Sequence, residues 1–278
     1  MRQQIYSLQA ARGLAALTIM AVHANTFAPV APWLEWGRYS VQLFFFLSGY
    51  IIFHIHDGRP IDLRQFAVSR AIRIYPPYLP IGLFSAIAYV CIGRHFDWLA
   101  SLTLMPGQTA LIPAWTLQRE VFFYAFVGFL FYKKVALRGL YAWAAIIIAV
   151  ALTRYPLNSL YSVPLGIENL FFVLGATVRR TGWVPTFRCP GPLLALGDAS
   201  YAIYLVHLPL MGGLWRVGFS FLPMMIISVL AGLLYHRGVE RPLIALTKRL
   251  FFRKSATRRS WLRPIPPEHQ ALEHRSAI

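Results

Sequence analysis

Long apolar stretches alternate with short polar connections over the first 236 residues of the chain. Eight stretches are long enough to cross a bilayer, which takes about 20 residues, or fewer where a helix includes residues from its flanks. Because every backbone polar group must be satisfied internally in lipid, such stretches form helices. The sequence therefore predicts an all-α, polytopic transmembrane helical bundle. The predicted spans are approximately 5–27, 39–56, 75–93, 115–132, 139–154, 162–178, 191–212 and 217–236.

The basic residues predict how this bundle is oriented. Eight spans place both termini on one side of the membrane, and 22 of the 27 Lys and Arg residues fall on that side. Basic residues concentrate in cytoplasmic loops. We therefore predict that both termini are cytoplasmic. Residues 1–247 are predicted to form the transmembrane domain, and residues 248–278 a basic, disordered cytoplasmic tail.

The composition excludes several classes of protein. Hydrophobic residues make up 57% of the 278 residues and charged residues only 13%, which indicates an integral membrane protein. The net charge of +17 is divided among many connections and forms no single stripe, which argues against nucleic acid as a partner. Cys91 and Cys189 lie in unrelated contexts and predict neither a disulfide nor a metal site. The connection 94–114 fits either an outer loop or a re-entrant segment packed against protein.

The first predicted span contains two polar residues of special interest, Arg12 and His23. Eleven residues separate them, which is about 16 Å along a helix axis. A charge at the membrane face is therefore followed by a titratable group inside the membrane. Ionisable side chains are costly in hydrocarbon and usually mark a functional site. The alternative is a histidine that only bonds a neighbouring helix.

Two more titratable residues are expected at the depth of His23. The predicted topology places Glu120 and His207 in the outer halves of the fourth and seventh spans. A carboxylate beside an imidazole orients the ring and stabilises the imidazolium, as general base chemistry requires. We therefore predict that His23 and Glu120 are catalytic. An ion pair of Glu120 with Arg119 is less natural, because adjacent residues point to different helix faces.

A second group of charged residues is expected near the inner face. Arg70 and Arg73 are spaced i, i+3 on a helix that is predicted to end before Pro76 and Pro77. Arg12 enters the membrane at the same depth. Guanidinium groups match the geometry of phosphate, so these three arginines form a candidate phosphate site. Arginines at an inner boundary also serve as topology anchors, which is the alternative.

Six motifs along the chain together resemble a known family. They are RGLAALTIMAVH, FFFLSGY (44–50), RAIRIYPPY, WTLQREVFFY, SYAIYLVHLP and ERP (240–242), in this order. The resemblance is to the acyltransferase 3 family of bacterial integral-membrane O-acyltransferases, and it covers roughly residues 1–245. It implies transfer of an acyl group, commonly acetyl from acetyl-CoA, to a hydroxyl of an exopolysaccharide, lipopolysaccharide or related glycan. It also implies a multi-pass protein of the bacterial inner membrane.

The resemblance also implies roles for individual residues. Arg12 and His23 match the family's first-span signature, with His23 as the suspected catalytic base. Arg70 and Arg73 match an RxxR element associated with acyl-CoA. Two further elements match Ser48 with Gly49 and Trp115 with Glu120. The candidates for binding substrate or stabilising an oxyanion are Ser48, Trp115, Tyr201, Tyr204 and His207.

The chain departs from the family in two respects. The family usually has about ten spans, whereas eight are predicted here, and the sequence predicts no appended extracytoplasmic esterase-like domain of the kind that some members carry, so we expect the membrane domain itself to handle the acceptor. The expected partners are an acyl-CoA donor, a carbohydrate or glycolipid acceptor and the lipid bilayer, with no metal. A proton-coupled transporter of an envelope precursor is the alternative, because membrane carboxylates and histidines also build proton relays. A structural subunit of a polysaccharide assembly is a third possibility.

Overall fold

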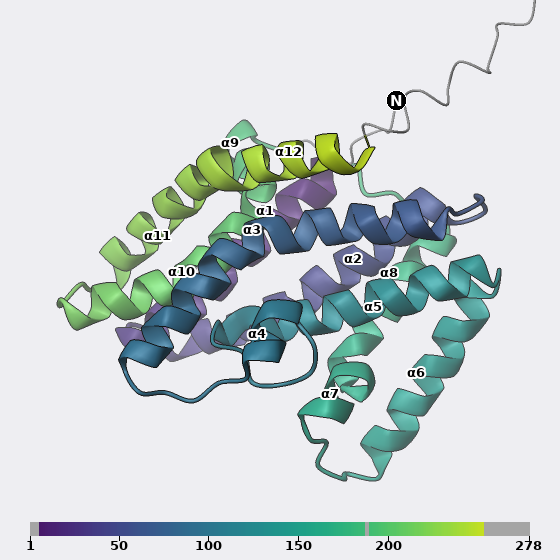
Figure 1. Ribbon diagram of the computed structural model, residues 1–278, viewed down its shortest axis with the longest axis horizontal. Coiled ribbons are helices and arrows are strands. Elements are labelled where there is room, and N and C mark those ends of the chain that lie inside the picture. The colour runs from purple at the N-terminus through teal and green to yellow at the C-terminus, as the bar shows by residue number, and fades with distance from the viewer. Residues whose placement is uncertain (1–5, 187–188, 253–278) are drawn as a thin grey trace, which may run out of the picture.

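The computed structural model describes residues 6–186 and 189–252, and these residues form helices without any strand (Figure 1). The predicted all-α fold is thereby confirmed for this part of the chain. The α-helices are α1 (Tyr6–Phe27), α2 (Ser40–His56), α3 (Leu63–Cys91), α4 (Trp98–Thr103), α5 (Trp115–Tyr132), α6 (Ala136–Leu152), α7 (Ser159–Leu165), α8 (Leu170–Arg180), α9 (Gly191–Asp198), α10 (Ser200–Arg216), α11 (Phe221–Tyr235) and α12 (Arg241–Phe252). Shorter segments are the 3-10 helices η1 (Pro32–Tyr39), η2 (Ile112–Ala114) and η3 (Ile167–Asn169), and a π-helical turn, η4 (His236–Glu240).

Each of the eight predicted stretches contains helix, but the helices differ in apolarity. By length and composition, four helical segments among the described residues are able to cross a membrane. A fifth is added if α9 and α10 count as one bent span, and α6 is a shorter apolar helix. The first and fourth predicted stretches, α1 and α5, are not among these segments. Helix α1 carries Arg12, and α5 carries Arg119 and Glu120. The four segments are Pro32–His56, Leu63–Cys91, Ser159–Arg180 and Phe221–Phe252.

Helix α3 continues through its prolines, so the prediction that it ends before Pro76 is wrong. A proline removes a backbone donor and favours a break, but neighbouring helices in a bundle can satisfy the disturbed turn. The hydroxyl of Tyr201 donates to the carbonyl of Ile74 at 2.9 Å, and that of Tyr235 donates to the carbonyl of Pro77 at 2.7 Å. These two tertiary hydrogen bonds join the proline-containing segment to α10 and α11, whereas the carbonyls that lose their intrahelical donor at Pro76, Pro77 and Pro80 are those of Ile72, Arg73 and Pro76.

The predicted stretch 191–212 is two helices instead of one. Helices α9 and α10 meet at Ala199 with a bend of 70°. At Gly197 the backbone of α9 lies against α1, where a Cβ would collide with the carbonyl of Gln9. This close crossing turns the chain, and α10 then begins with Ser200 and Tyr201 beside the centre of the bundle.

Helices α2 and α8 are in backbone contact, because a glycine on each helix faces a backbone carbonyl of the other. A Cβ at Gly49 would collide with the carbonyl of Phe172, and one at Gly175 would collide with the carbonyl of Phe46. Small residues allow helix backbones in membranes to approach closely. The ring of Phe172 also stacks on Phe123 of α5, at 4.2 Å between centroids. Gly49, one of the motif residues, therefore has a packing role.

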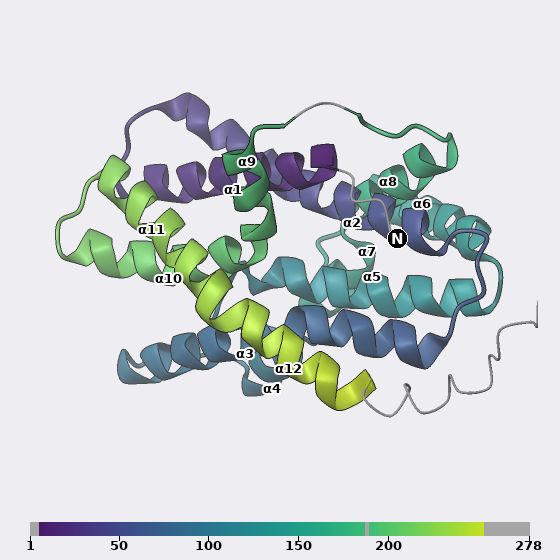
Figure 2. The same cartoon turned by 90° about the horizontal axis from the view of Figure 1, so that it is seen from above.

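The connections gather at the two ends of the bundle (Figures 1 and 2). The α2–α3 and α5–α6 connections lie at one end, to the right in Figure 1, and the α10–α11 connection lies at the opposite end. Arg180, which ends α8, forms a 2.8 Å ion pair with Asp57, which follows α2. The α8 terminus therefore belongs to the first end, and α12 lies beside α3 there.

The connection 94–114, which contains α4 and η2, packs against protein. The hydroxyls of Tyr75 and Tyr78 on α3 donate to the carbonyls of Thr103 and Ser101, both at 2.6 Å. Gln118 of α5 donates to two further carbonyls of the connection. At the carboxyl end, α12 includes residues 248–252 of the predicted tail, and the rest of that tail lies outside the described residues.

Candidate active site

Three cavities follow one another along α2. Val41 and Gln42 line the first, residues from Phe44 to Ile52 line the second, and Ile51, Ile55 and His56 line the third. Their volumes are about 380, 70 and 630 Å³ respectively. We call them the histidine cavity, the arginine cavity and the vestibule. Wide compartments at both ends of α2 are thus separated by a narrow one.

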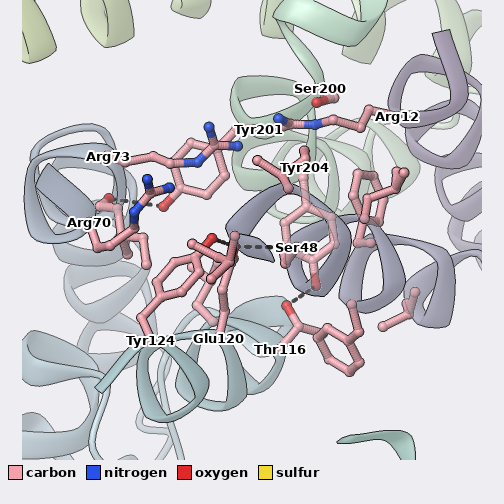
Figure 3. Close-up of a pocket in the computed structure, with 18 residues that line it drawn as sticks. Arg12, Ser48, Arg70, Arg73, Thr116, Glu120, Tyr124, Ser200, Tyr201 and Tyr204 are labelled. Atoms are coloured by element: carbon pink, nitrogen blue, oxygen red, sulfur yellow. Dashed lines mark hydrogen bonds between the residues drawn. The ribbon is translucent and has the colours of Figure 1, made fainter. Parts of the chain in front are cut away.

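The arginine cavity brings together polar side chains from α1, α2, α3, α5 and α10 (Figure 3). Seven of the predicted site residues are among these side chains. They come from five helices that are far apart in the sequence. Its polar lining consists of Arg12, Ser48, Arg70, Arg73, Thr116, Glu120, Tyr124, Ser200, Tyr201 and Tyr204.

Cationic groups are in excess in the arginine cavity. Glu120 is the one carboxylate in the lining of this cavity, and Arg12, Arg70 and Arg73 all interact with it electrostatically; Arg12 and Arg73 also interact with Glu240 outside the lining. None of the three guanidinium groups forms an ion pair within 4 Å of a carboxylate in the described part of the chain. Leaving charge unpaired in a partly buried site is costly, typically several kcal/mol. The cavity is therefore suited to an anionic ligand.

Glu120 is held by two hydroxyls. Ser48 donates to its Oε1 at 3.0 Å, and Tyr124, one helical turn further along α5, donates to the same oxygen. The guanidinium of Arg70 lies 5.5 Å from the centroid of the Tyr124 ring and 5.6 Å from that of Phe66, which is cation–π geometry. Ser48 and Tyr124 thus fix the position of the Glu120 carboxylate, which interacts with the arginines.

The cavities share walls, which makes them neighbours in a series. Tyr204 and Val41 line both the arginine and the histidine cavities. Arg70 and Arg73 line both the arginine cavity and the vestibule. The hydroxyl of Tyr204 lies 2.7 Å from that of Thr116, so this part of the wall is itself polar. A long ligand that occupied all three cavities would reach from one end of α2 to the other.

The histidine cavity is formed around His23 by α1, η1, α2, α5 and α10. Asn25 accepts hydrogen bonds from the backbone of Val30 and Ala31, at 2.8 and 3.1 Å, and so folds the chain after α1 back toward α2. This brings Glu35 of η1 into electrostatic interaction with His23. The polar and aromatic lining consists of His23, Thr26, Glu35, Arg38, Tyr39, Gln42, Trp115, Glu168 and Tyr204.

The ring of Trp115 borders the histidine cavity, and Arg119 fixes its position. The guanidinium of Arg119 lies 5.1 Å from the centroid of the Trp115 ring, and Arg119 also pairs with Glu168 at 3.3 Å. Its Nη1 donates to the carbonyl of Ser162 at 2.7 Å. Arg119 therefore pairs with Glu168, and the alternative of an ion pair with Glu120 does not hold.

His23 lies against His207 and not against Glu120. The two imidazole centroids are 5.2 Å apart, and His207 is fully buried on α10. No hydrogen bond joins His23 to Glu120 among the described residues, and the two line different cavities. The expectation that Glu120 orients His23 is therefore wrong. Equal depth along two helices does not fix the direction in which each side chain points.

The vestibule is predominantly basic. Arg70 and Arg73 form its inner wall, and Arg59 and Lys248 lie further out, with Asp62 as the acidic lining residue. Lys248 comes from the part of α12 that the sequence assigns to the tail. Sequence reasoning also missed Tyr124 and Glu35. Tyr124 was detectable from its i, i+4 spacing to Glu120, whereas Glu35 lies in a connection whose path only the structure defines.

Comparison with known proteins identifies relatives for most of this structure. A family model described as "Acyltransferase domain" matches residues 5–189, which include α1 to α8. The chain is 30% identical over 197 residues to "Exopolysaccharide production protein ExoZ" of Rhizobium meliloti (strain 1021). That alignment covers 63% of this chain and 59% of the relative, so the chain spans about three fifths of the relative's length. No solved structure matches.

Proposed function

The chain belongs to the acyltransferase domain family, and from that premise we propose that it is a membrane O-acyltransferase that moves acetyl from acetyl-CoA to a carbohydrate hydroxyl. The relative with 30% identity is named for exopolysaccharide production, which favours an exopolysaccharide unit as the acceptor. Lipopolysaccharide units and glycolipids belong to the same class of acceptor.

The observation that carries this proposal is the cationic excess between two wide cavities. Arg12, Arg70 and Arg73 lack ion-pair partners among the described residues, and a phosphate-containing ligand would supply them. Ligand sites typically measure about 300–1,000 Å³, so the vestibule is wide enough for a nucleotide and the arginine cavity is not. The residues present therefore fit the nucleotide end of acetyl-CoA in the vestibule and a slender chain in the arginine cavity.

The arginines then divide the binding of the donor. Arg70 and Arg73, at the boundary, bind the phosphates, and Arg59 and Lys248 add positive charge in the vestibule. Arg12 lines only the narrow cavity, further along the same path. Glu120 fixes side chains that line the arginine cavity through its hydrogen bonds with Ser48 and Tyr124, and we therefore assign it to the donor site.

His23 acts as the general base in the histidine cavity. It takes the proton from the acceptor hydroxyl, whose oxygen forms a bond to the acyl carbon while the carbon–sulfur bond breaks. The protonated His23 then returns the proton to the departing thiolate. Tyr204 lies on the wall shared by the two cavities, and its hydroxyl, which donates to the carbonyl of Pro113 at 2.8 Å, would have to turn from that carbonyl to serve as the oxyanion donor. Trp115 offers an aromatic surface for a sugar ring.

The distribution of charge supports an orientation for this enzyme. Basic residues gather at the end of the bundle that holds the vestibule, where the α2–α3 and α5–α6 connections carry Arg59, Lys133 and Lys134. By the rule for cytoplasmic loops, this end faces the cytoplasm, where acetyl-CoA is present. The proposal thus includes eight spans, cytoplasmic termini, a bacterial inner-membrane location and an acceptor that approaches from the outer side.

Purified protein incubated with acetyl-CoA tests the proposal. We expect release of CoA that depends on His23, and faster release when envelope glycan from a strain lacking this gene is added. His23→Ala should abolish release, whereas the matched control His95→Ala, at an exposed loop position, should retain it. A proton-coupled transporter would leave the thioester intact in every sample, so intact acetyl-CoA in the wild-type sample would refute the proposal.

A further inference from the structure

The imidazole of His207 is held in a single tautomer by the backbone. Its Nδ1 lies 2.7 Å from the carbonyl oxygen of Tyr204, in the preceding turn of α10. A carbonyl oxygen only accepts hydrogen bonds, so Nδ1 carries the hydrogen. A neutral imidazole has one N–H group, and Nε2 of His207 therefore presents a lone pair.

This lone pair has no partner in the structure. His207 is fully buried, and its Nε2 makes no hydrogen bond with any described residue. Buried polar atoms are rarely left unsatisfied, and a catalytic role is one of the explanations for those that are. The ring of His207 lies beside the ring of His23, with 5.2 Å between centroids and an angle of 38° between the planes, and beside that of Tyr204 at 5.6 Å.

We propose that His207 is a positioning residue whose Nε2 accepts a hydrogen bond from one ring nitrogen of His23, so that the other nitrogen faces the acceptor hydroxyl. This inference rests on the proposed function. No hydrogen bond joins the two rings among the described residues, and catalytic hydrogen bonds often tighten only in the complex with substrate. His207 remains neutral while His23 takes up and returns the proton. His207 thus fills the role that sequence reasoning assigned to Glu120.

Two substitutions separate this role from a structural one. His207→Asn places an amide donor near the position of Nδ1, which retains the hydrogen bond to the carbonyl of Tyr204 but removes Nε2. His207→Gln places an amide oxygen near the position of Nε2, where it can accept from His23. His95→Asn, at an exposed loop position, is the matched control. Gel filtration and the unfolding midpoint establish that each variant is folded.

The assay measures acetyl-CoA turnover with glycan from the deletion strain. We expect His207→Asn to lower kcat by about 10²–10⁴-fold, the contribution typical of general base catalysis, with the KM for acetyl-CoA unchanged. His207→Gln should recover at least tenfold over His207→Asn. Wild-type kcat in the Asn variant, or a Gln variant no better than Asn, overturns the inference while the proposed function stands. Absence of turnover in the wild type overturns the proposed function, and this inference with it.

A measurement on the wild-type protein complements the kinetics and uses a variant, whose folding is established as above, only to assign a signal. Nitrogen-15 NMR of histidine-labelled protein distinguishes protonated from unprotonated ring nitrogens, and the signal absent from the His207→Gln spectrum identifies the residue. We expect Nδ1 of His207 to be protonated and Nε2 to be unprotonated. A protonated Nε2 cannot accept a hydrogen bond and would overturn the inference.

Discussion

Removal of Arg73 should weaken donor binding without weakening the fold. Arg73 lines both the vestibule and the arginine cavity and forms no ion pair with a described residue. A hydrogen bond to a charged group is worth about 1.5–3 kcal/mol, and each 1.4 kcal/mol is a tenfold change in affinity. Arg73→Ala should therefore raise the KM for acetyl-CoA about ten- to a hundredfold. Arg73 forms no ion pair within 4 Å, and its removal breaks only longer-range interactions with Glu120 and Glu240, so the unfolding midpoint of the ligand-free protein should stay close to that of wild type.

The assay is CoA release as a function of acetyl-CoA concentration. Arg73→Lys should lie between wild type and Arg73→Ala, because a bidentate group becomes a point charge. Arg64→Ala is the matched control, since Arg64 is exposed on the same helix and outside the three cavities. If the double variant Arg70→Ala, Arg73→Ala binds acetyl-CoA as well as wild type does, these residues are topology anchors and the assignment of the donor site is refuted.

Three other predictions follow from the structure. His23→Ala should abolish acetyl transfer with expression and membrane insertion near normal, as measured by turnover and by immunoblotting of membranes; full activity would refute the role of the base. Gly49→Ala should lower the free energy of unfolding by about 1–3 kcal/mol through overpacking against α8, whereas Gly213→Ala, which has open space, should not destabilise; equal unfolding midpoints would contradict the packing argument. A single cysteine at Asp62 should resist an impermeant thiol reagent on intact cells and one at Arg38 should react; labelling at Asp62 would invert the proposed orientation.

The hydrophobic pattern predicted the helical stretches because the local sequence alone shows which segments are apolar enough to lie in a bilayer. Their interruptions depended on tertiary contacts instead. Helix α3 passes through Pro76 in a segment whose carbonyls at Ile74 and Pro77 accept hydrogen bonds from tyrosine hydroxyls of α10 and α11. The bend at Ala199 follows from the crossing of α9 with α1. Neither contact is visible in a single stretch of sequence.

The motifs predicted most of the side chains that gather in the arginine cavity, but not how the polar residues pair. Depth along a helix gives one coordinate of a side chain, and the rotation of the helix gives another. Glu120 and His23 therefore line different cavities although similar depths were predicted for them. The carboxylate that interacts with His23 is Glu35, which reaches it only because Asn25 folds back the connection after α1.

Acetyl transfer across the membrane is the most direct test of the account. Sealed inverted membrane vesicles from a strain that lacks the gene, complemented with wild type or His23→Ala, are given acetyl-CoA labelled in the acetyl group. The account predicts alkali-labile label in the glycan fraction of wild-type inverted vesicles, none with His23→Ala, and none in sealed right-side-out vesicles. Absence of label in the glycan of wild-type inverted vesicles, or equal labelling with His23→Ala, would contradict it.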